Sequence, residues 1–178
     1  MRSEVFMAGT GGQGVLLIGQ LLMQTASAEG RQVSYFPIYT PEVRGGFTSC
    51  TVVIADGVVG SPISGRPACM VLMDQPCVDD HLHRLREGGL ALLNSSLVRQ
   101  APGEDRRMLW IPATDKAVEI GNERIANMVM LGAYVAATGV VPIEAIERAL
   151  RVVLPERHHK YLPLNEQAIR LGAELVQA

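Results

Sequence analysis

The sequence predicts an α/β fold, a Rossmann-like three-layer sandwich with a mostly parallel, mixed sheet and a helical carboxyl-terminal third. Three observations support this prediction. Short apolar runs alternate with segments of helical spacing over roughly the first 110 residues, a glycine-rich loop joins the first apolar run to the first helical segment, and every periodic segment after residue 112 has helical spacing.

The amino-terminal part is predicted to contain three strands and one helix. Residues 4–8 form an apolar strand that ends at the glycine loop, and residues 15–29 show helical spacing up to a glycine. Residues 32–38 are rich in β-branched and aromatic side chains and predict a second strand, which the loop 39–46 ends. Residues 47–54 predict a third strand, one that can run antiparallel to its neighbours.

The middle of the chain predicts a β-α-β unit followed by one more strand. Residues 68–73 and 90–94 are apolar strands, and the amphipathic segment 76–87 between them is a helix that ends at two glycines. After a charged loop over residues 95–107, residues 108–111 predict the last short strand.

Four helices complete the chain. Their apolar spacing places them at residues 115–121, 125–138, 143–153 and 165–175. The chain shows no internal repeat and no linker, so we expect a single domain over residues 1–178.

Composition indicates a globular chain that associates with others. The 178 residues are 48% hydrophobic and carry a net charge of -2, which gives no general attraction to nucleic acid or to an anionic membrane. The longest apolar stretch, residues 128–141, is shorter than the roughly 20 residues that a membrane span needs. Because the mean hydropathy of +0.18 is high, we expect apolar surface that binds partners, and self-association of the isolated chain.

The cysteines suggest no metal centre and no disulfide framework. Cys50, Cys69 and Cys77 form no C-x-x-C pair, and their odd number leaves at least one thiol unpaired. Glu4 interrupts the first apolar run, which favours a strand over an export signal. We therefore expect a cytoplasmic chain with reduced thiols and no bound metal.

The glycine loop fits the G-x-G-x-x-G pattern with Gly9, Gly11 and Gly14, between a predicted strand and a predicted helix. Glycines at such a place let backbone amides approach a phosphate at the helix start. The acidic residue that holds the ribose of NAD is missing at the end of the second strand, which disfavours a dehydrogenase. The absence of Gly-Lys-Ser/Thr excludes a P-loop nucleotide triphosphatase. A ligand-free turn, a phosphate and a partner's backbone remain open as alternatives.

The loop 39–46 places Glu42 and Arg44 between Pro41 and the pair Gly45-Gly46. The planar guanidinium of Arg44 suits a carboxylate or a phosphate. A surface ion pair with Glu42, worth roughly 0 to 1 kcal/mol, explains the residues equally well. In a parallel sheet this loop and the glycine loop would lie at the same edge, where ligands bind.

No catalytic set is evident in the remaining polar residues. His81 and His83 are two apart on a predicted helix, so they cannot hold one metal as an i, i+4 pair would, and we expect both to be solvated. His158 and His159 fall in a predicted basic loop. No Ser/His/Asp or Cys/His combination has a recognisable spacing, and we predict no catalytic residue in this chain.

The motifs MAGTGGQGV near the start, YTPEVRGG at residues 39–46 and Ser61-Pro62 occur in this order. With this arrangement the chain resembles the gamma subunit of the 2-oxoacid:ferredoxin (acceptor) oxidoreductases, the family that acts on pyruvate, 2-oxoglutarate, ketoisovalerate or indolepyruvate. The resemblance covers nearly the whole chain. One departure is Thr40, which replaces the glycine expected before Pro41.

The resemblance implies a subunit of an enzyme complex that decarboxylates a 2-oxoacid, such as 2-oxoglutarate or pyruvate, to an acyl-CoA and reduces ferredoxin in anaerobic metabolism. It implies that alpha and beta subunits hold thiamine diphosphate and Mg²⁺, and that beta or a delta subunit holds the [4Fe-4S] clusters. The isolated gamma chain would be inactive, and its own contact would be with coenzyme A or with partner subunits. The residues carried over by motif position are Gly9, Gly11, Gly12, Gly14, Glu42, Arg44, Gly45 and Gly46. The alternative is a stand-alone Rossmann-like module that binds a phosphate or nucleotide ligand.

Overall fold

A computed structural model describes residues 2–39, 46–59, 65–103 and 107–177. Its six strands form one sheet in the order β2-β3-β1-β4-β5-β6. The strands are β1 Arg2–Thr10, β2 Gln32–Tyr39, β3 Phe47–Ala55, β4 Cys69–Leu72, β5 Leu90–Asn94 and β6 Arg107–Ile111. The strands predicted from the sequence are all present.

The sheet is mixed because β3 runs against its two neighbours. β1 and β2 both pair with β3 in antiparallel fashion, and β1, β4, β5 and β6 are parallel to one another. Five of the six described strands therefore end at the same side of the sheet, which we call the carboxyl edge. The predicted antiparallel third strand and the mostly parallel sheet are both confirmed.

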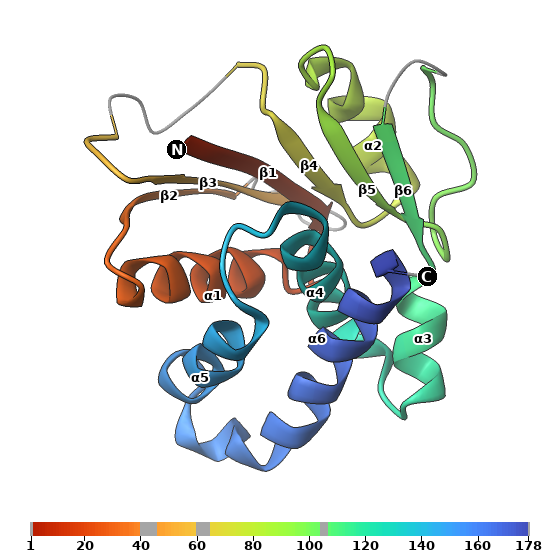
Figure 1. Cartoon of the computed structure of the whole chain (residues 1–178). Helices are drawn as coiled ribbons and strands as arrows, with labels where there is room; N and C mark the ends of the chain where they lie inside the picture. The colour runs from red at the N-terminus through yellow and green to blue at the C-terminus, as the bar shows by residue number, and fades with distance from the viewer. Residues whose placement is uncertain (1, 40–45, 60–64, 104–106, 178) are drawn as a thin grey trace.

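Helices cover the two faces of the sheet unequally. The helices are α1 Val15–Ala28, α2 Gln75–His81, α3 Ala113–Glu119, α4 Ala126–Thr138, α5 Ile143–Val153 and α6 Leu162–Gln177. Figure 1 shows α1 and α4 against one face, with α5 and α6 packed outside them, and α2 on the opposite face. Short 3₁₀ segments are η1 Leu82–Arg84, η2 Glu123–Ile125 and η3 Glu156–Tyr161.

Two buried clusters follow from the alternation of side chains along the strands. On β1, Val5 and Met7 join the large core under α1 and α4, while Phe6 and Ala8 join the smaller core under α2. Met70, Met73, Met128 and Met130 are all buried in these clusters or beside them. The sheet is thus buried on both faces around β1 and β4, as a central strand pair requires.

Helices α4 and α6 cross at two glycines. A Cβ at Gly132 would lie 1.9 Å from the carbonyl oxygen of Ile169, and one at Gly172 would lie 1.9 Å from that of Val129. The two backbones are therefore in direct contact, which fixes α6 against the helix that itself packs on the sheet.

Several helix boundaries differ from the prediction. Helix α3 begins at Ala113 rather than 115, because the side chains of Asn94 and Ser96 accept hydrogen bonds from the amides of Thr114 and Asp115. Helix α6 begins three residues early, at Leu162, since a proline in the first turn lacks only an amide that has no partner there.

The two histidine segments also differ from the prediction. The helix predicted over residues 76–87 is α only to His81 and continues as the 3₁₀ segment η1. The predicted basic loop with His158 and His159 is the 3₁₀ helix η3, in which a ring nitrogen of His159 lies 2.9 Å from the Leu154 carbonyl oxygen. Across the described parts of the chain, every helix is too short or too polar to cross a bilayer.

Candidate functional site

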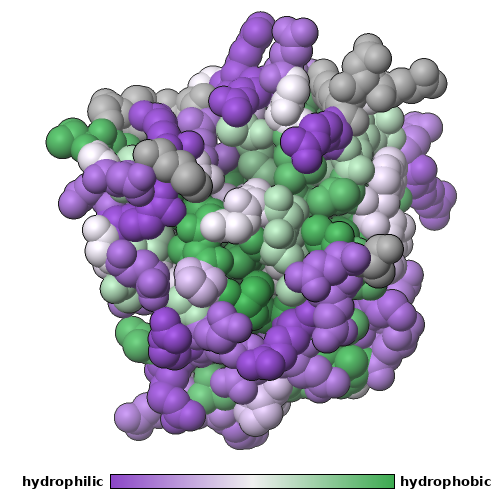
Figure 2. All heavy atoms as spheres, viewed as in Figure 1, coloured by the Kyte–Doolittle hydropathy of each residue, from purple (hydrophilic) through white to green (hydrophobic). Residues whose placement is uncertain are grey.

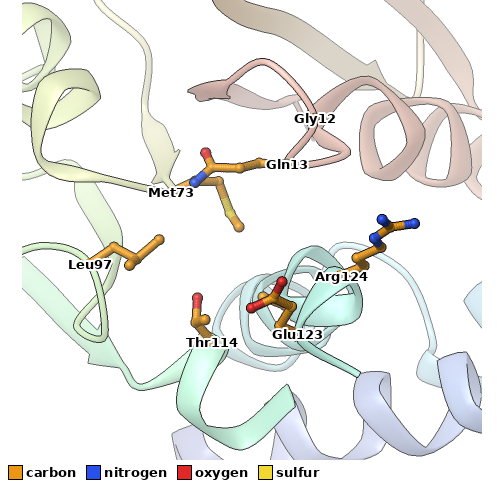
Figure 3. Close-up of a pocket in the computed structure, with 8 residues that line it drawn as sticks. Gly12, Gln13, Met73, Leu97, Thr114, Glu123 and Arg124 are labelled. Atoms are coloured by element: carbon orange, nitrogen blue, oxygen red, sulfur yellow. The ribbon is translucent and has the colours of Figure 1, made fainter. Parts of the chain in front are cut away.

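The loops that follow β1, β4, β5 and β6 meet around a cavity of about 250 Å³ at the carboxyl edge. Figure 3 shows Met73 and Leu97 on one side of it, the loop of Gly12 and Gln13 above, and Thr114 and Glu123 below. The lining residues are Gly12, Gln13, Met73, Leu97, Thr114, Glu123, Arg124 and Ala126. Binding sites of α/β sheets are expected at this edge.

The side chain of Gln13 holds the glycine loop closed. Its Oε1 accepts a hydrogen bond of 2.8 Å from the backbone amide of Thr10, and the backbone amide of Gln13 donates to the Thr10 carbonyl at 3.2 Å. Gly9 makes room for this contact, because a Cβ there would lie 2.6 Å from Gln13 Oε1. The turn is thus specified by one polar side chain together with the glycines.

The glycine loop ends in a left-handed residue at the start of α1. Gly14 has a φ of +70°, and a Cβ on it would lie 2.4 Å from Asn127 Nδ2 of helix α4. That amide donates a 3.1 Å hydrogen bond to the Gly14 carbonyl. Glycine is therefore required both by the backbone conformation and by the close approach of α4.

The glycine loop contacts Gly46, the last residue of the predicted loop 39–46, at the carboxyl edge. The amide of Gly11 donates to the carbonyl of Gly46 at 3.0 Å, which joins the glycine loop to the residue before β3. Gly12 faces the cavity, with a φ of +95°. Glu42, Arg44 and Gly45 lie outside the described residues, so their predicted roles stay predictions, as does the effect of Thr40.

Buried polar side chains that belong to no sequence motif also build this edge. Asn94, fully buried at the end of β5, donates to the Met73 carbonyl at 3.1 Å and to the Thr114 hydroxyl at 2.9 Å. Asp74 begins α2 and accepts a hydrogen bond from the Cys77 amide. A polar residue at the end of an apolar strand or directly after it was the available signal for both.

The electrostatics of the cavity are mixed. Helix α1 begins beside the cavity without a side-chain cap, so its first amides and positive dipole end favour an anion. The start of η2 and α4 is different, because the side chain of Asn122 accepts from the Arg124 amide and that of Asn127 accepts from the Met128 amide. Arg124 adds a positive charge at the rim, whereas the carboxylate of Glu123 points into the cavity (Figure 3). An anionic group therefore fits beside the glycine loop, and a hydrogen-bond donor fits beside Glu123.

The thiols are poorly suited to chemistry. Burial raises the pKa of Cys50 to about 12 and that of Cys69 to about 12. Burial also raises the pKa of Cys77, and the neighbouring Asp74 raises it further. Thiolates at these positions are scarce at neutral pH. Within the described ranges, His, Cys, Asp and Glu side chains nowhere gather in threes that could hold a metal.

The prediction that His81 is solvated was wrong. Its ring is half-buried, with its centre 5.0 Å from that of Phe6 and 6.4 Å from that of Phe47. Burial lowers the pKa of His81 below its usual value, and the nearby Arg84 lowers it further. His83 is exposed, as predicted. The apolar neighbours come from β1 and β3, which helical periodicity within α2 does not reveal.

Comparison with known proteins connects this site to a family. The profile of the pyruvate ferredoxin/flavodoxin oxidoreductase family matches residues 4–175. The chain is 38% identical to the ketoisovalerate oxidoreductase subunit VorA of Methanothermobacter marburgensis over 96% of its own length, but it spans only 36% of that longer relative. It is 34% identical to the 2-oxoglutarate synthase subunit KorC of Methanothermobacter thermautotrophicus, covering 99% of this chain and 96% of KorC.

Solved structures show the same fold. The gamma subunit of a keto/oxoacid ferredoxin oxidoreductase from Geobacter sulfurreducens superposes with a TM-score of 0.85 at 33% identity, over 98% of both chains. A 2-oxoglutarate:ferredoxin oxidoreductase from Magnetococcus marinus, solved with 2-oxoglutarate, coenzyme A and succinyl-CoA, matches with a TM-score of 0.89 at 18% identity. That match covers 99% of this chain and 31% of the larger one, and it shows the fold alone. The predicted α/β fold and the resemblance to gamma subunits are confirmed, and the chain belongs to the pyruvate ferredoxin/flavodoxin oxidoreductase family.

Proposed function

We propose that this chain is the gamma subunit of a 2-oxoacid:ferredoxin oxidoreductase. The complex would convert a 2-oxoacid, coenzyme A and oxidised ferredoxin to an acyl-CoA, CO₂ and reduced ferredoxin, with two electrons leaving the substrate. The observation that carries the proposal is the near end-to-end similarity to a gamma subunit, at 33% identity over 98% of both chains. Pyruvate, 2-oxoglutarate and branched 2-oxoacids such as ketoisovalerate are the substrates to test, because relatives carry these names.

We assign the thiamine diphosphate, Mg²⁺ and [4Fe-4S] clusters to alpha, beta or delta partner subunits. Iron-sulfur clusters need several cysteine thiolates close together. Here Cys50 lies on β3, Cys69 on β4 and Cys77 on α2, and all three are buried in the apolar cores. This distribution supports a non-catalytic role for the chain within the complex.

We propose that the chain's own ligand contact is with coenzyme A. A cavity of about 250 Å³ is smaller than a typical site for a whole cofactor, so it would take one end of the molecule only. The phosphate-bearing end fits best, with phosphate oxygens facing the glycine loop at Gly12 and the side chain of Arg124. The amino group of the adenine could then donate to Glu123. Glu42, Arg44, Gly45 and Gly46 would line the approach or contact a partner subunit.

Apolar surface supports binding to partner subunits. A shallow hollow of about 390 Å³ lies between the amino ends of β5 and β6 and the carboxyl ends of α4 and α6. Figure 2 shows apolar side chains gathered in the middle of this face. The apolar residues lining the hollow are Leu90, Met108, Leu109, Ala137 and Val176. On the edge strands, Phe36, Ile38 and Trp110 are also exposed. We propose that alpha and beta subunits cover these surfaces in a cytoplasmic complex.

The function can be tested by capturing the tagged chain from its native source. The eluate is assayed for dye reduction that depends on both coenzyme A and a 2-oxoacid, with pyruvate, 2-oxoglutarate and branched 2-oxoacids compared. Co-elution of thiamine-dependent subunits with activity supports the proposal and identifies the substrate. A chain that elutes alone, inactive and with a bound nucleotide would instead support a stand-alone phosphate-binding module.

Arg44→Ala tests the role of the second motif. The substitution should weaken complex assembly or coenzyme A use much more than it lowers the melting temperature of the isolated chain. Unchanged assembly together with unchanged coenzyme A kinetics would contradict the assignment of Arg44.

Self-association is tested on the chain alone. Light scattering of the purified chain should give a mass above 19.2 kDa at high concentration that falls toward the mass of one chain on dilution. A strict monomer at high concentration would show that the exposed apolar residues do not bind a second copy.

A further inference from the structure

The carboxylate of Asp74 connects two segments of the carboxyl edge. Its Oδ1 accepts a 3.1 Å hydrogen bond from the amide of Cys77 in the first turn of α2. Its Oδ2 accepts from the amide of Thr10 at 3.1 Å and also from the Thr10 hydroxyl, which lies 64 residues away in sequence. The residue is only 7% exposed. Its partners within the described chain are neutral amide and hydroxyl groups, and not the charged side chain of a Lys, Arg or His.

These contacts continue into the glycine loop. The backbone amide of Thr10 donates to both Asp74 Oδ2 and Gln13 Oε1. One acceptor thus comes from the connection between β4 and α2, and the other from the glycine loop itself. Gln13 lines the cavity, and the amide of Gly11 donates to Gly46. A shift of Thr10 would therefore move the whole turn from Gly11 to Gly14.

Helix capping alone does not explain Asp74. Asn caps a helix as well as Asp does, since one acceptor oxygen is enough. The second oxygen of Asp74 is turned away from α2 toward the amide and hydroxyl donors of Thr10. Only a carboxylate presents acceptors in both directions, whereas the amide group of Asn would place its own donors against one set of partners.

We propose that Asp74 is the positioning residue of the glycine loop: it fixes Thr10 and Gln13 so that the turn at Gly12, which lines the cavity, faces coenzyme A in the correct geometry. The identity of the ligand, coenzyme A, rests on the proposed function, whereas the positioning of the loop by Asp74 does not. Because Asp74 touches the loop and not the ligand, its loss should affect the binding of coenzyme A and leave the chemistry of the partner subunits intact.

The first test is hydrogen exchange on the full chain, with Asp74→Asn compared with Asp80→Asn, an exposed carboxylate on the same helix. The hydrogen-bonded amides of Thr10, Gly11 and Gln13 should exchange about 10-fold faster in Asp74→Asn, and the rest of the sheet should be unchanged. Thr10→Val removes the hydroxyl and should act in the same direction, whereas Thr10→Ser retains it and should resemble the parent. Unchanged loop exchange, or equal acceleration throughout the chain, would overturn the proposal.

The second test uses the assembled complex. Asp74→Asn should raise the KM for coenzyme A about 10-fold, with kcat and the KM for the 2-oxoacid nearly unchanged, while Asp80→Asn changes none of them. Faster loop exchange with an unchanged KM for coenzyme A would refute the link to this ligand. If the parent complex needs no coenzyme A, the proposed function fails, and the exchange experiment still decides whether Asp74 positions the loop.

Discussion

The α4–α6 crossing and the carboxyl edge are held together by opposite means. At the crossing, Gly132 and Gly172 bring two backbones into contact, and the surrounding side chains are apolar and buried. At the edge, Asp74, Asn94 and Asn127 are buried polar residues that bind loops from different strands. The crossing tolerates no added volume, whereas the edge tolerates no lost acceptor or donor. Stability and loop geometry should therefore respond to different substitutions.

The largest expected effect is at the crossing. Gly132→Ala should lower the free energy of unfolding by about 3 kcal/mol, because the new Cβ would meet the Ile169 carbonyl oxygen and force the helices apart. Alanine's better helix propensity returns only about 1 kcal/mol, so the clash dominates. Urea unfolding measures the change.

A matched glycine serves as the control for this prediction. Gly57 has open space where a Cβ would lie and is not in the left-handed region, so Gly57→Ala should change stability by less than about 0.5 kcal/mol. If both substitutions cost the same, the crossing is not limited by backbone contact.

The next largest effect belongs to the carboxyl edge. Asn94→Ala should cost about 2 kcal/mol, because the Met73 carbonyl and the Thr114 amide and hydroxyl all lose a partner in a buried place. The half-exposed cap Asn122, whose side chain accepts from the Arg124 amide, offers a comparison at about 1 kcal/mol or less. Equal losses at the two asparagines would show that burial does not set the cost.

How far the sequence predicts this molecule differs between the same two regions. Apolar periodicity located the strands and helices, and the motif order gave the family, because both depend on local spacing. Local spacing did not predict that Gly132 and Gly172 face each other, since 40 residues separate them and each is an ordinary small residue on its own helix.

At the site, local spacing was enough for part of the prediction only. The glycines of the first loop could be recognised because a strand–turn–helix needs them within a few residues. The roles of Asp74 and Asn127 could not, since each acts on a loop more than 60 residues away. His81 was misjudged for the same reason, because its aromatic neighbours belong to other strands.

A smaller effect sharpens the comparison, because Gly14 combines both kinds of constraint. Gly14→Ala should cost between about 1 and 2 kcal/mol, from the left-handed backbone and from the approach of Asn127 Nδ2. Asn127→Ala loses the hydrogen bonds to Gly14 and Met128 but makes room for the new methyl group. The double variant should therefore cost less than the sum of the single variants, and strict additivity would show that the two residues do not share one space.

The smallest expected effect is a pH dependence at His81, where a half-buried polar ring contacts aromatic residues of the core under α2. Burial keeps the pKa of this imidazole below its usual value, so the unfolded chain binds the proton more readily than the folded one. The contribution of His81 to stability is thus complete above the pKa of the unfolded residue, about 6.5, and is lost as the pH falls through the lower pKa of the folded residue.

His81→Phe keeps a ring against Phe6 and Phe47 and cannot take up a proton. Between pH 7.5 and 5.5 the urea midpoint of the parent should fall more than that of His81→Phe, whereas a variant of the exposed neighbour, His83→Gln, should follow the parent. Parallel pH curves for the parent and His81→Phe would mean that the ring titrates as freely when folded as when unfolded, and that the aromatic contacts do not exclude water from it.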